Sequence, residues 1–194
     1  AMTGALAAGK KQMDLFGVVI IGCVTAIGGG TLRDMLLGNY PIIWVENVHY
    51  LLAIPGASLL TVMIAPLMRY LARLFLAIDA IGLAVFSIVG AQKTLMLGFS
   101  AEIAIVMGVV TGVFGGVIRD ILCNQVPLIF KKELYALVAL LTAILYVGMK
   151  FSGVAEWISL TVAVTFGFSF RMLAIRYHWS MPKFDYQYQS DSLH

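Results

Sequence analysis

The deciding stretch of this sequence is Gly28-Gly29-Gly30-Thr31-Leu32-Arg33-Asp34, which recurs as Phe114-Gly115-Gly116-Val117-Ile118-Arg119-Asp120. The likeness continues on both sides of the stretch. Further matched pairs are Gly22 and Gly108, Thr25 and Thr111, Leu36 and Leu122, Pro41 and Pro127, and Ile43-Trp44 and Ile129-Phe130. The two members of every pair are about 86 positions apart, which indicates a duplication. Both copies place glycines and an Arg-Asp pair deep inside an apolar segment.

The composition indicates an integral membrane protein. Of the 194 residues, 61% are hydrophobic and 12% are charged, whereas apolar residues make up about 45–50% of a soluble domain. The apolar residues form long runs and do not alternate with polar ones, so the pattern favours membrane helices over a transmembrane barrel. The net charge of +3 is spread over loop positions and does not indicate nucleic-acid binding.

The apolar runs predict an all-α protein with seven transmembrane helices, of which the first is truncated. Residues 1–9 are apolar but too short to span a bilayer, and the repeat alignment indicates that the leading half of this helix is missing. The other helices are expected at about 15–37, 48–68, 76–97, 101–122, 134–149 and 154–175. The corresponding units are a first three-helix repeat (1–68), a second, inverted repeat (76–150), a seventh helix (154–176) and a polar, aromatic cytoplasmic tail (177–194).

The positions of the basic residues predict the orientation. A repeat of three helices is odd, so the second copy enters the membrane from the opposite side, as in many transport proteins. One side then carries Lys10, Lys11, Arg69, Arg73, Lys131, Lys132, Arg171, Arg176 and Lys183, and the other carries Lys93 and Lys150. Lys and Arg are enriched in cytoplasmic loops, so the C-terminus is expected in the cytoplasm and the N-terminus outside.

The repeated glycines predict a polar path near the middle of the membrane. Glycine weakens a helix and frees backbone carbonyls, which are tolerated in a membrane only where protein or water satisfies them. We therefore expect breaks, or kinks, that line a pore and suit a cation. The candidate residues are Gly28, Gly29, Gly30, Thr31, Gly112, Gly115 and Gly116, and Thr25 and Thr111 add hydroxyl oxygens. The alternative is that the glycines only allow helices to pack closely.

Six charged residues are candidates for the polar lining or the gate of that path: Arg33, Asp34, Asp79, Lys93, Arg119 and Asp120. Neighbours in sequence point in different directions on a helix, so each arginine is expected to find its partner on another helix. We expect Arg119 to pair with Asp79, and the equivalent partner of Arg33 to fall in the missing segment. These pairs either pin each bundle or form a charged constriction. Lys93 is either a regulatory charge or a lysine that snorkels to the interface.

The sequence shows no pattern typical of a metal-binding protein or an enzyme. His49 and His178 are isolated, so no metal site is expected, and no cofactor is implied. No catalytic triad, paired catalytic carboxylates or nucleotide loop stands out, so the protein is not expected to be an enzyme. Trp44, Tyr50, Phe130 and Tyr135 are interpreted as aromatic anchors at the membrane interfaces.

The two Gly-Arg-Asp motifs, together with Thr3-Gly4-Ala5-Leu6-Ala7 and Asp14-Leu15-Phe16-Gly17, resemble the bacterial branch of the trimeric intracellular cation (TRIC) channels. These sequences are also grouped under an uncharacterised or "glycine transporter" label. The resemblance covers nearly the whole chain. It implies a homotrimer in the bacterial inner membrane, with one pore per protomer, lined by glycine-kinked second and fifth helices. It also implies that the permeant species are monovalent cations, mainly potassium with some sodium.

Rival functions remain open at this level. The same half-helix ends would suit a secondary transporter of a small zwitterion such as glycine, and static kinks would suit a scaffold or lipid-binding membrane protein. Apart from Asp34, Asp79 and Asp120, the apolar segments hold few carboxylates for proton coupling. This scarcity favours the channel.

Overall fold

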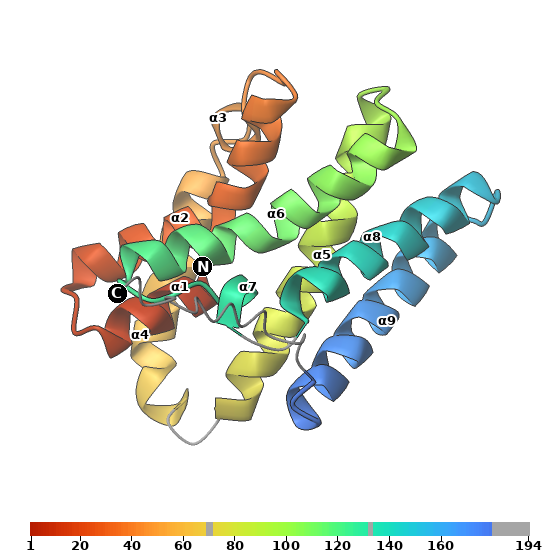
Figure 1. Ribbon diagram of the computed structural model, residues 1–194. Helices are drawn as coiled ribbons and strands as arrows, with labels where there is room; N and C mark the ends of the chain where they lie inside the picture. The colour runs from red at the N-terminus through yellow and green to blue at the C-terminus, as the bar shows by residue number, and fades with distance from the viewer. Residues whose placement is uncertain (69–71, 132–133, 180–194) are drawn as a thin grey trace, which may run out of the picture.

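The computed structural model describes residues 1–68, 72–131 and 134–179, and within these ranges the chain folds into helices joined by short loops. The helices are α1 (Met2–Lys10), α2 (Leu15–Leu36), α3 (Ile43–Glu46), α4 (Tyr50–Met68), α5 (Ala72–Met96), α6 (Ala101–Leu122), α7 (Leu128–Lys131), α8 (Tyr135–Phe151) and α9 (Glu156–Arg176). This confirms the all-α class. The loops gather at two opposite ends of the molecule (Figure 1). Arg69, Lys132, Lys183 and the tail from residue 180 lie outside the described residues.

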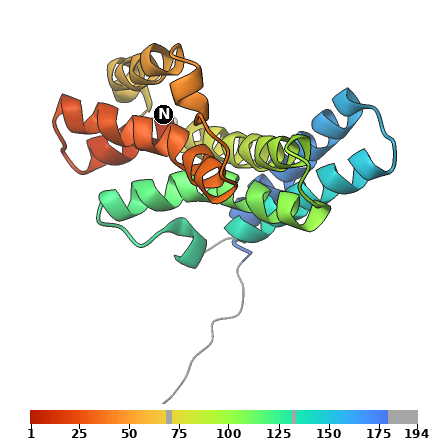
Figure 2. The same cartoon turned by 90° about the horizontal axis from the view of Figure 1, so that it is seen from above.

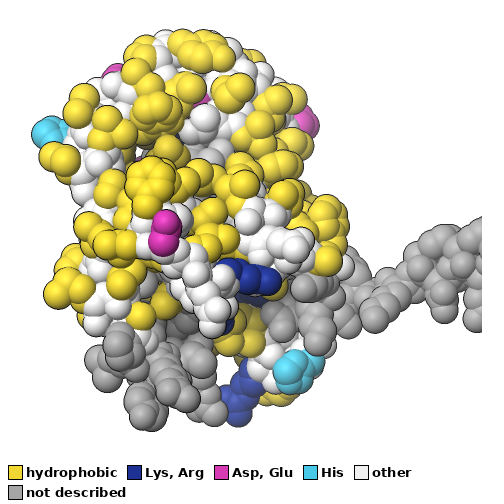
Figure 3. All heavy atoms as spheres, turned by 90° about the vertical axis from the view of Figure 1, so that its left-hand side faces the viewer, with side chains coloured by type: hydrophobic (Ala, Val, Ile, Leu, Met, Phe, Trp, Pro, Cys, Tyr) yellow, Lys and Arg dark blue, Asp and Glu magenta, His cyan; other side chains and the backbone are white. Residues whose placement is uncertain are grey.

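Four of the described helices are long and apolar enough to cross a membrane: Leu15–Leu36, Leu76–Met96, Ala101–Leu122 and Glu156–Arg176. Two more apolar helices, Tyr50–Ala65 and Tyr135–Phe151, are shorter. Large hydrophobic side chains on these helices face outward, and Leu52, Met63 and Met96 are more than three-quarters exposed. Figure 3 shows apolar side chains over much of one face, with Lys and Arg confined to its lower part. Such a surface is typical of a protein surrounded by lipid.

The two copies end their long helices in the same way. Gly38 follows α2 with a φ of 64°, and its equivalent after α6, Asn124, has a φ of 49°. Gly and Asn tolerate this left-handed conformation best, and it terminates a helix. In each copy the next residue then donates a backbone hydrogen bond of 2.8 Å, from Asn39 to Asp34 and from Gln125 to Asp120.

The short helices α3 and α7 were not predicted. Each follows the proline that comes after a long helix, Pro41 or Pro127, and each has only four residues. Proline has no N–H to donate and readily precedes or begins a new helical turn. A single turn is too short to produce a recognisable hydrophobic period.

The helices form two groups that meet along α5 and α6. In Figures 1 and 2, α1, α2 and α4 lie on one side, and α8 and α9 lie on the other. Small buried residues, among them Ala91, Ala104, Ala143 and Ala163, let α5, α6, α8 and α9 approach closely. Small residues serve this role in membrane proteins because lipid supplies no hydrophobic force between helices.

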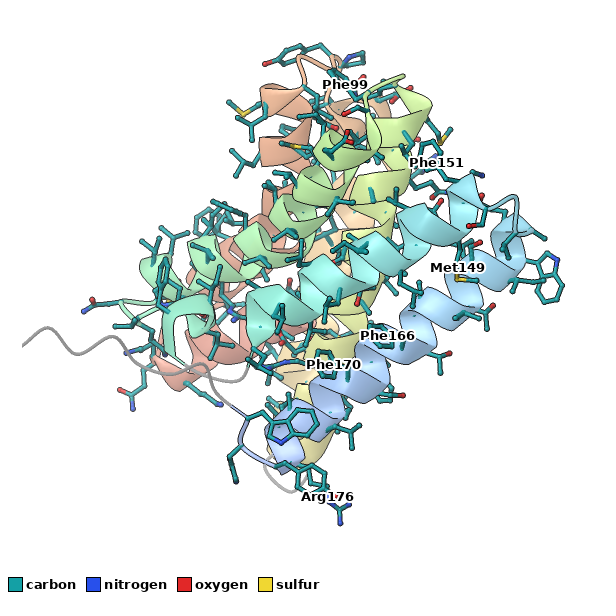
Figure 4. The ribbon with its side chains drawn as sticks, turned by 45° about the vertical axis from the view of Figure 1, so that its right-hand side comes forward. Phe99, Met149, Phe151, Phe166, Phe170 and Arg176 are labelled. Carbon is teal, nitrogen blue, oxygen red and sulfur yellow. The ribbon has the colours of Figure 1, made fainter. Side chains whose placement is uncertain are left out.

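The last helix is tied to the second group at its first residue. Glu156 accepts hydrogen bonds from Gln92 of α5 (2.9 Å) and Tyr146 of α8 (2.7 Å), and it forms an ion pair with Lys150. Figure 4 shows that Phe166 and Phe170 lie along α9, with Arg176 at its far end. The seventh long segment therefore packs as part of the second group.

Candidate functional site

The glycines of the repeated stretch lie where α2 crosses α6. A Cβ atom on Gly29 would collide with the backbone carbonyl oxygen of Thr111, and one on Gly115 would collide with that of Thr25. These two contacts are equivalent under the repeat. Both helices run without interruption through their glycines, so the glycines do not break them, and the expected kinks stay a prediction. The glycines instead remove side chains, so that the two backbones can touch.

The same equivalence holds for the neighbouring helices. A Cβ on Gly4 would meet the side chain of Thr25, and one on Gly90 would meet that of Thr111. These contacts hold α1 against α2 and α5 against α6. Glycine packing is therefore repeated in both halves of the molecule, as the alternative interpretation of the sequence expected.

A cavity of about 250 Å³ opens beside the crossing. Helices α1, α2, α5, α6 and α8 contribute to its wall. The lining residues are Ala1, Met2, Thr3, Thr25, Ala26, Gly29, Ile78, Asp79, Gly82, Leu83, Phe86, Thr111, Gly112, Gly115, Gly116, Arg119 and Tyr135. Asp79 and Arg119 give the cavity one negative and one positive side chain, set among small and apolar residues.

The cavity gathers part of the predicted set. Gly29, Gly112, Gly115, Gly116, Asp79 and Arg119 line it, whereas Gly28, Gly30, Thr31, Arg33, Asp34, Lys93 and Asp120 do not. Gly28 contacts the side chain of Ile118 across the crossing instead. Thr31 accepts a hydrogen bond from the indole Nε1 of Trp44 (3.2 Å), which fixes the turn after α2. The cavity therefore brings together six of the predicted residues, and their role in a pore stays a prediction.

Two threonine hydroxyls in the cavity wall are held by their own helices. Thr25 Oγ1 donates to the carbonyl of Ile21 at 2.6 Å, and Thr111 Oγ1 donates to that of Met107 at 2.7 Å. These bonds are again equivalent under the repeat. Each hydroxyl has a single hydrogen, so its remaining capacity is that of an acceptor.

The first charged cluster joins the two groups of helices. Arg33 Nε and Nη2 donate to Asp34 Oδ1 at 2.9 and 2.8 Å, and Lys93 Nζ of α5 lies 3.4 Å from Asp34 Oδ2. The Asp34 side chain is completely buried, and that of Lys93 is 24% exposed. Lys93 therefore pairs with Asp34, and the interpretation that it snorkels to the interface is wrong.

The second cluster occupies the equivalent place at the other end of α5. Arg119 Nε donates to Asp120 Oδ1 at 2.8 Å, and Arg119 Nη1 lies 3.5 Å from Asp79 Oδ1. The pairing of Arg119 with Asp79 is confirmed. Asp120 also accepts a hydrogen bond from the backbone N–H of Leu128 (3.1 Å), which anchors α7.

One expectation about the clusters is only partly met. Each arginine was expected to find its partner on another helix, and Arg119 does pair with Asp79 of α5. However, both arginines also bond to the aspartate that follows them. The directions of neighbouring Cβ atoms do differ. However, the arginine side chain is long enough to bend around the helix and reach the next residue, and burial favours the shortest pairing.

Sequence reasoning missed two further members of the second cluster. Arg171 was counted only among the basic residues of one membrane side, but it is 2% exposed, and its guanidinium carbon lies 4.8 Å from the centre of the Tyr135 ring. Tyr135 was interpreted as an interfacial anchor, but it is 6% exposed and lines the cavity. Phe130, by contrast, is 75% exposed. The available signal was the position of Arg171 inside an apolar helix, five residues before its end. Such charges rarely face lipid, so a buried position could have been predicted.

Comparison with known proteins identifies the family. A family model described as "Glycine transporter" matches residues 1–66 and 76–150. Curated relatives include a UPF0126 membrane protein of Vibrio cholerae, 41% identical over 95% of this chain and 77% of its own length. Another is the UPF0126 inner membrane protein YadS of Escherichia coli, 39% identical over 95% of this chain and 90% of its own length.

Solved structures give the same result. The TRIC trimeric intracellular cation channel orthologue from Rhodobacter sphaeroides superposes with a TM-score of 0.87 at 39% identity, covering 91% of each chain. A second structure, described as the structural basis for conductance through TRIC cation channels, has a TM-score of 0.88 at 34% identity and covers 96% of this chain and 92% of its own. Since family model, relatives and structures agree over most of its length, this membrane protein belongs to the bacterial branch of the TRIC family.

Proposed function

We propose that the protein is a channel for monovalent cations, chiefly potassium, with a conduction path in each protomer of a homotrimer. The path runs through the cavity beside the crossing of α2 and α6. The solved structures to which the chain is similar are those of cation channels, and one of them is described as trimeric. Beyond this similarity to cation channels, we propose where the path runs and which ion it conducts.

One observation carries this proposal: the cavity wall offers oxygen acceptors to a cation. Thr25 and Thr111 line the cavity, and their hydroxyls have committed their hydrogens to Ile21 and Met107, so the remaining capacity of these hydroxyls is that of acceptors. Hydroxyl oxygens and the Asp79 carboxylate are suitable ligands for a hard cation. A chloride ion would require donors, and Arg119 is already engaged with Asp79 and Asp120.

The proposed architecture is seven membrane helices, arranged as two inverted three-helix repeats and an added α9. The repeated contacts at Gly4 and Gly90, and at Gly29 and Gly115, support this symmetry. We place the protein in the bacterial inner membrane because a relative is an inner membrane protein. The bias of Lys and Arg supports an orientation with the N-terminus outside and the C-terminus in the cytoplasm.

A second candidate is a secondary transporter for a small zwitterion such as glycine. The description of the matching family model favours it, and Arg119 and Asp79 would respectively accommodate a carboxylate and an amine. However, both side chains already pair with each other at 3.5 Å. A substrate would first have to break that pair, so the channel is the better-supported function.

Recordings from the purified protein in a planar bilayer test the proposal. Under a KCl gradient we expect discrete current steps that reverse towards the potassium equilibrium potential, because the cavity offers acceptors and few donors. Replacing potassium with sodium should give smaller steps of the same sign, and replacing it with the bulky cation N-methyl-D-glucamine should abolish the steps.

The same preparation in liposomes provides the opposing result. An absence of current steps, together with saturable uptake of labelled glycine, would contradict the channel and establish the transporter. Empty liposomes and liposomes with heat-denatured protein serve as controls for leakage.

A further inference from the structure

Helix α9 lies outside the duplicated part of the chain, yet it places a buried charge behind the cavity wall. Arg171 is 2% exposed, which is costly for a guanidinium unless other groups compensate it. Its guanidinium carbon lies 4.8 Å from the centre of the Tyr135 ring. A planar cation over a tyrosine ring at this distance is attracted by the ring electrons.

Tyr135 separates Arg171 from the cavity. The tyrosine lines the cavity together with Asp79 and Arg119, and Arg171 does not. Arg119 Nη1 lies 3.5 Å from Asp79 Oδ1, and Arg171 stacks on the ring of Tyr135, which lines the same cavity as Asp79. The cavity therefore contains one carboxylate, Asp79, whose charge is balanced by one arginine in the wall and by another behind it.

We propose that Arg171 determines how strongly the conduction path prefers cations over anions. From behind Tyr135 it offsets part of the negative charge that Asp79 presents to the cavity. This inference rests on the proposed channel function and adds a specificity-determining residue that never touches the ion. Buried charges act over longer distances than exposed ones because little water screens them.

The arrangement also gives Arg171 a distinct role from Arg119. Arg119 is in contact with Asp79 and Asp120, so its loss would disturb the local geometry as well as the charge. Arg171 acts on the cavity through charge and through the position of the Tyr135 ring. A lysine keeps the charge but loses the planar stacking, so the two contributions can be separated by substitution.

The test compares Arg171→Gln with the wild type in planar bilayers under a KCl gradient. We expect the ratio of potassium to chloride permeability to rise roughly threefold or more, because one compensating charge has been removed from a poorly screened site. Arg171→Lys should stay close to the wild-type ratio. Arg176→Gln is the matched control, since it removes the same charge from an exposed position at the end of the same helix, and it should leave the ratio unchanged.

A double substitution keeps the test valid if Arg171→Gln alone does not fold. Asp79→Asn should lower the permeability ratio. Adding Arg171→Gln to it should raise the ratio again, and it removes a carboxylate and a guanidinium together, so that neither charge is left buried without the other. Equal ratios in Asp79→Asn and in the double variant would overturn the inference, as would an unchanged ratio in a folded Arg171→Gln protein. In both cases the wild-type current would remain, whereas absence of wild-type current would overturn the proposed function and this inference with it.

Discussion

Replacing Gly29 with alanine is expected to lower the free energy of unfolding by about 1–3 kcal/mol or more, the range measured for overpacked sites. The added Cβ would collide with the carbonyl oxygen of Thr111. A backbone carbonyl cannot rotate away as a flexible side chain can, so α2 and α6 must separate. Thermal unfolding in detergent, monitored by circular dichroism, measures the loss. Gly115→Ala should behave alike, because it meets the Thr25 carbonyl in the same way.

The matched control for this prediction is Gly148→Ala in α8. A Cβ at that position would meet nothing within 4 Å. Because alanine is the better helix former, we expect the free energy of unfolding to stay the same or to rise by up to about 1 kcal/mol. Similar melting temperatures for Gly29→Ala and Gly148→Ala would show that the helices at the crossing can yield, and would contradict the close contact described above.

Replacing Asp34 with asparagine is expected to have the largest effect of any single charge change. We expect the free energy of unfolding to fall by about 3–5 kcal/mol. The Asp34 side chain is fully buried and is the counter-charge for both Arg33 and Lys93. Asparagine preserves the shape but leaves two cations without a carboxylate. The fraction of protein that survives heating in detergent as a single species in size-exclusion chromatography is the measurement.

Lys93→Met is the control for the Asp34 prediction. It removes the link between α2 and α5 but leaves the Arg33–Asp34 pair intact. The lysine is partly exposed, and partly exposed pairs contribute less than buried ones. We therefore expect a clearly smaller loss than for Asp34→Asn, and an equal loss would show that the Arg33–Asp34 pair contributes nothing.

The helix boundaries could be predicted well from the sequence. The expected helix 15–37 is α2 (Leu15–Leu36), and the expected 101–122 is α6 (Ala101–Leu122). Clear signals mark these ends: the Asp14 side chain accepts a hydrogen bond from the Gly17 N–H at the start of α2, and Gly38 and Asn124 end the two helices. Boundaries of this kind depend on residues close in sequence, which a single sequence shows directly.

Contacts between distant residues could not be predicted in the same way. The predicted layout put Asp79 on the same side of the membrane as Arg119, but nothing local indicated that Lys93 reaches Asp34 or that Arg171 lies over Tyr135. Such contacts depend on the rotation of each helix about its own axis, which one sequence does not determine. The glycines were assigned to breaks because their effect on the helix was weighed without the opposing backbone that they contact.

The two charged clusters also differ in composition. At one end of α5, Arg33 and Lys93 share a single carboxylate, that of Asp34. Towards its other end, Arg119 pairs with Asp79 and Asp120, and Arg171 lies over the ring of Tyr135 beside them. Asp79 and Lys93 are 14 positions apart on this helix, about 21 Å along its axis. One end of this helix therefore carries one more cation than carboxylate, whereas two arginines and two carboxylates gather towards the other, so the molecule is electrically asymmetric along α5 although its backbone is duplicated.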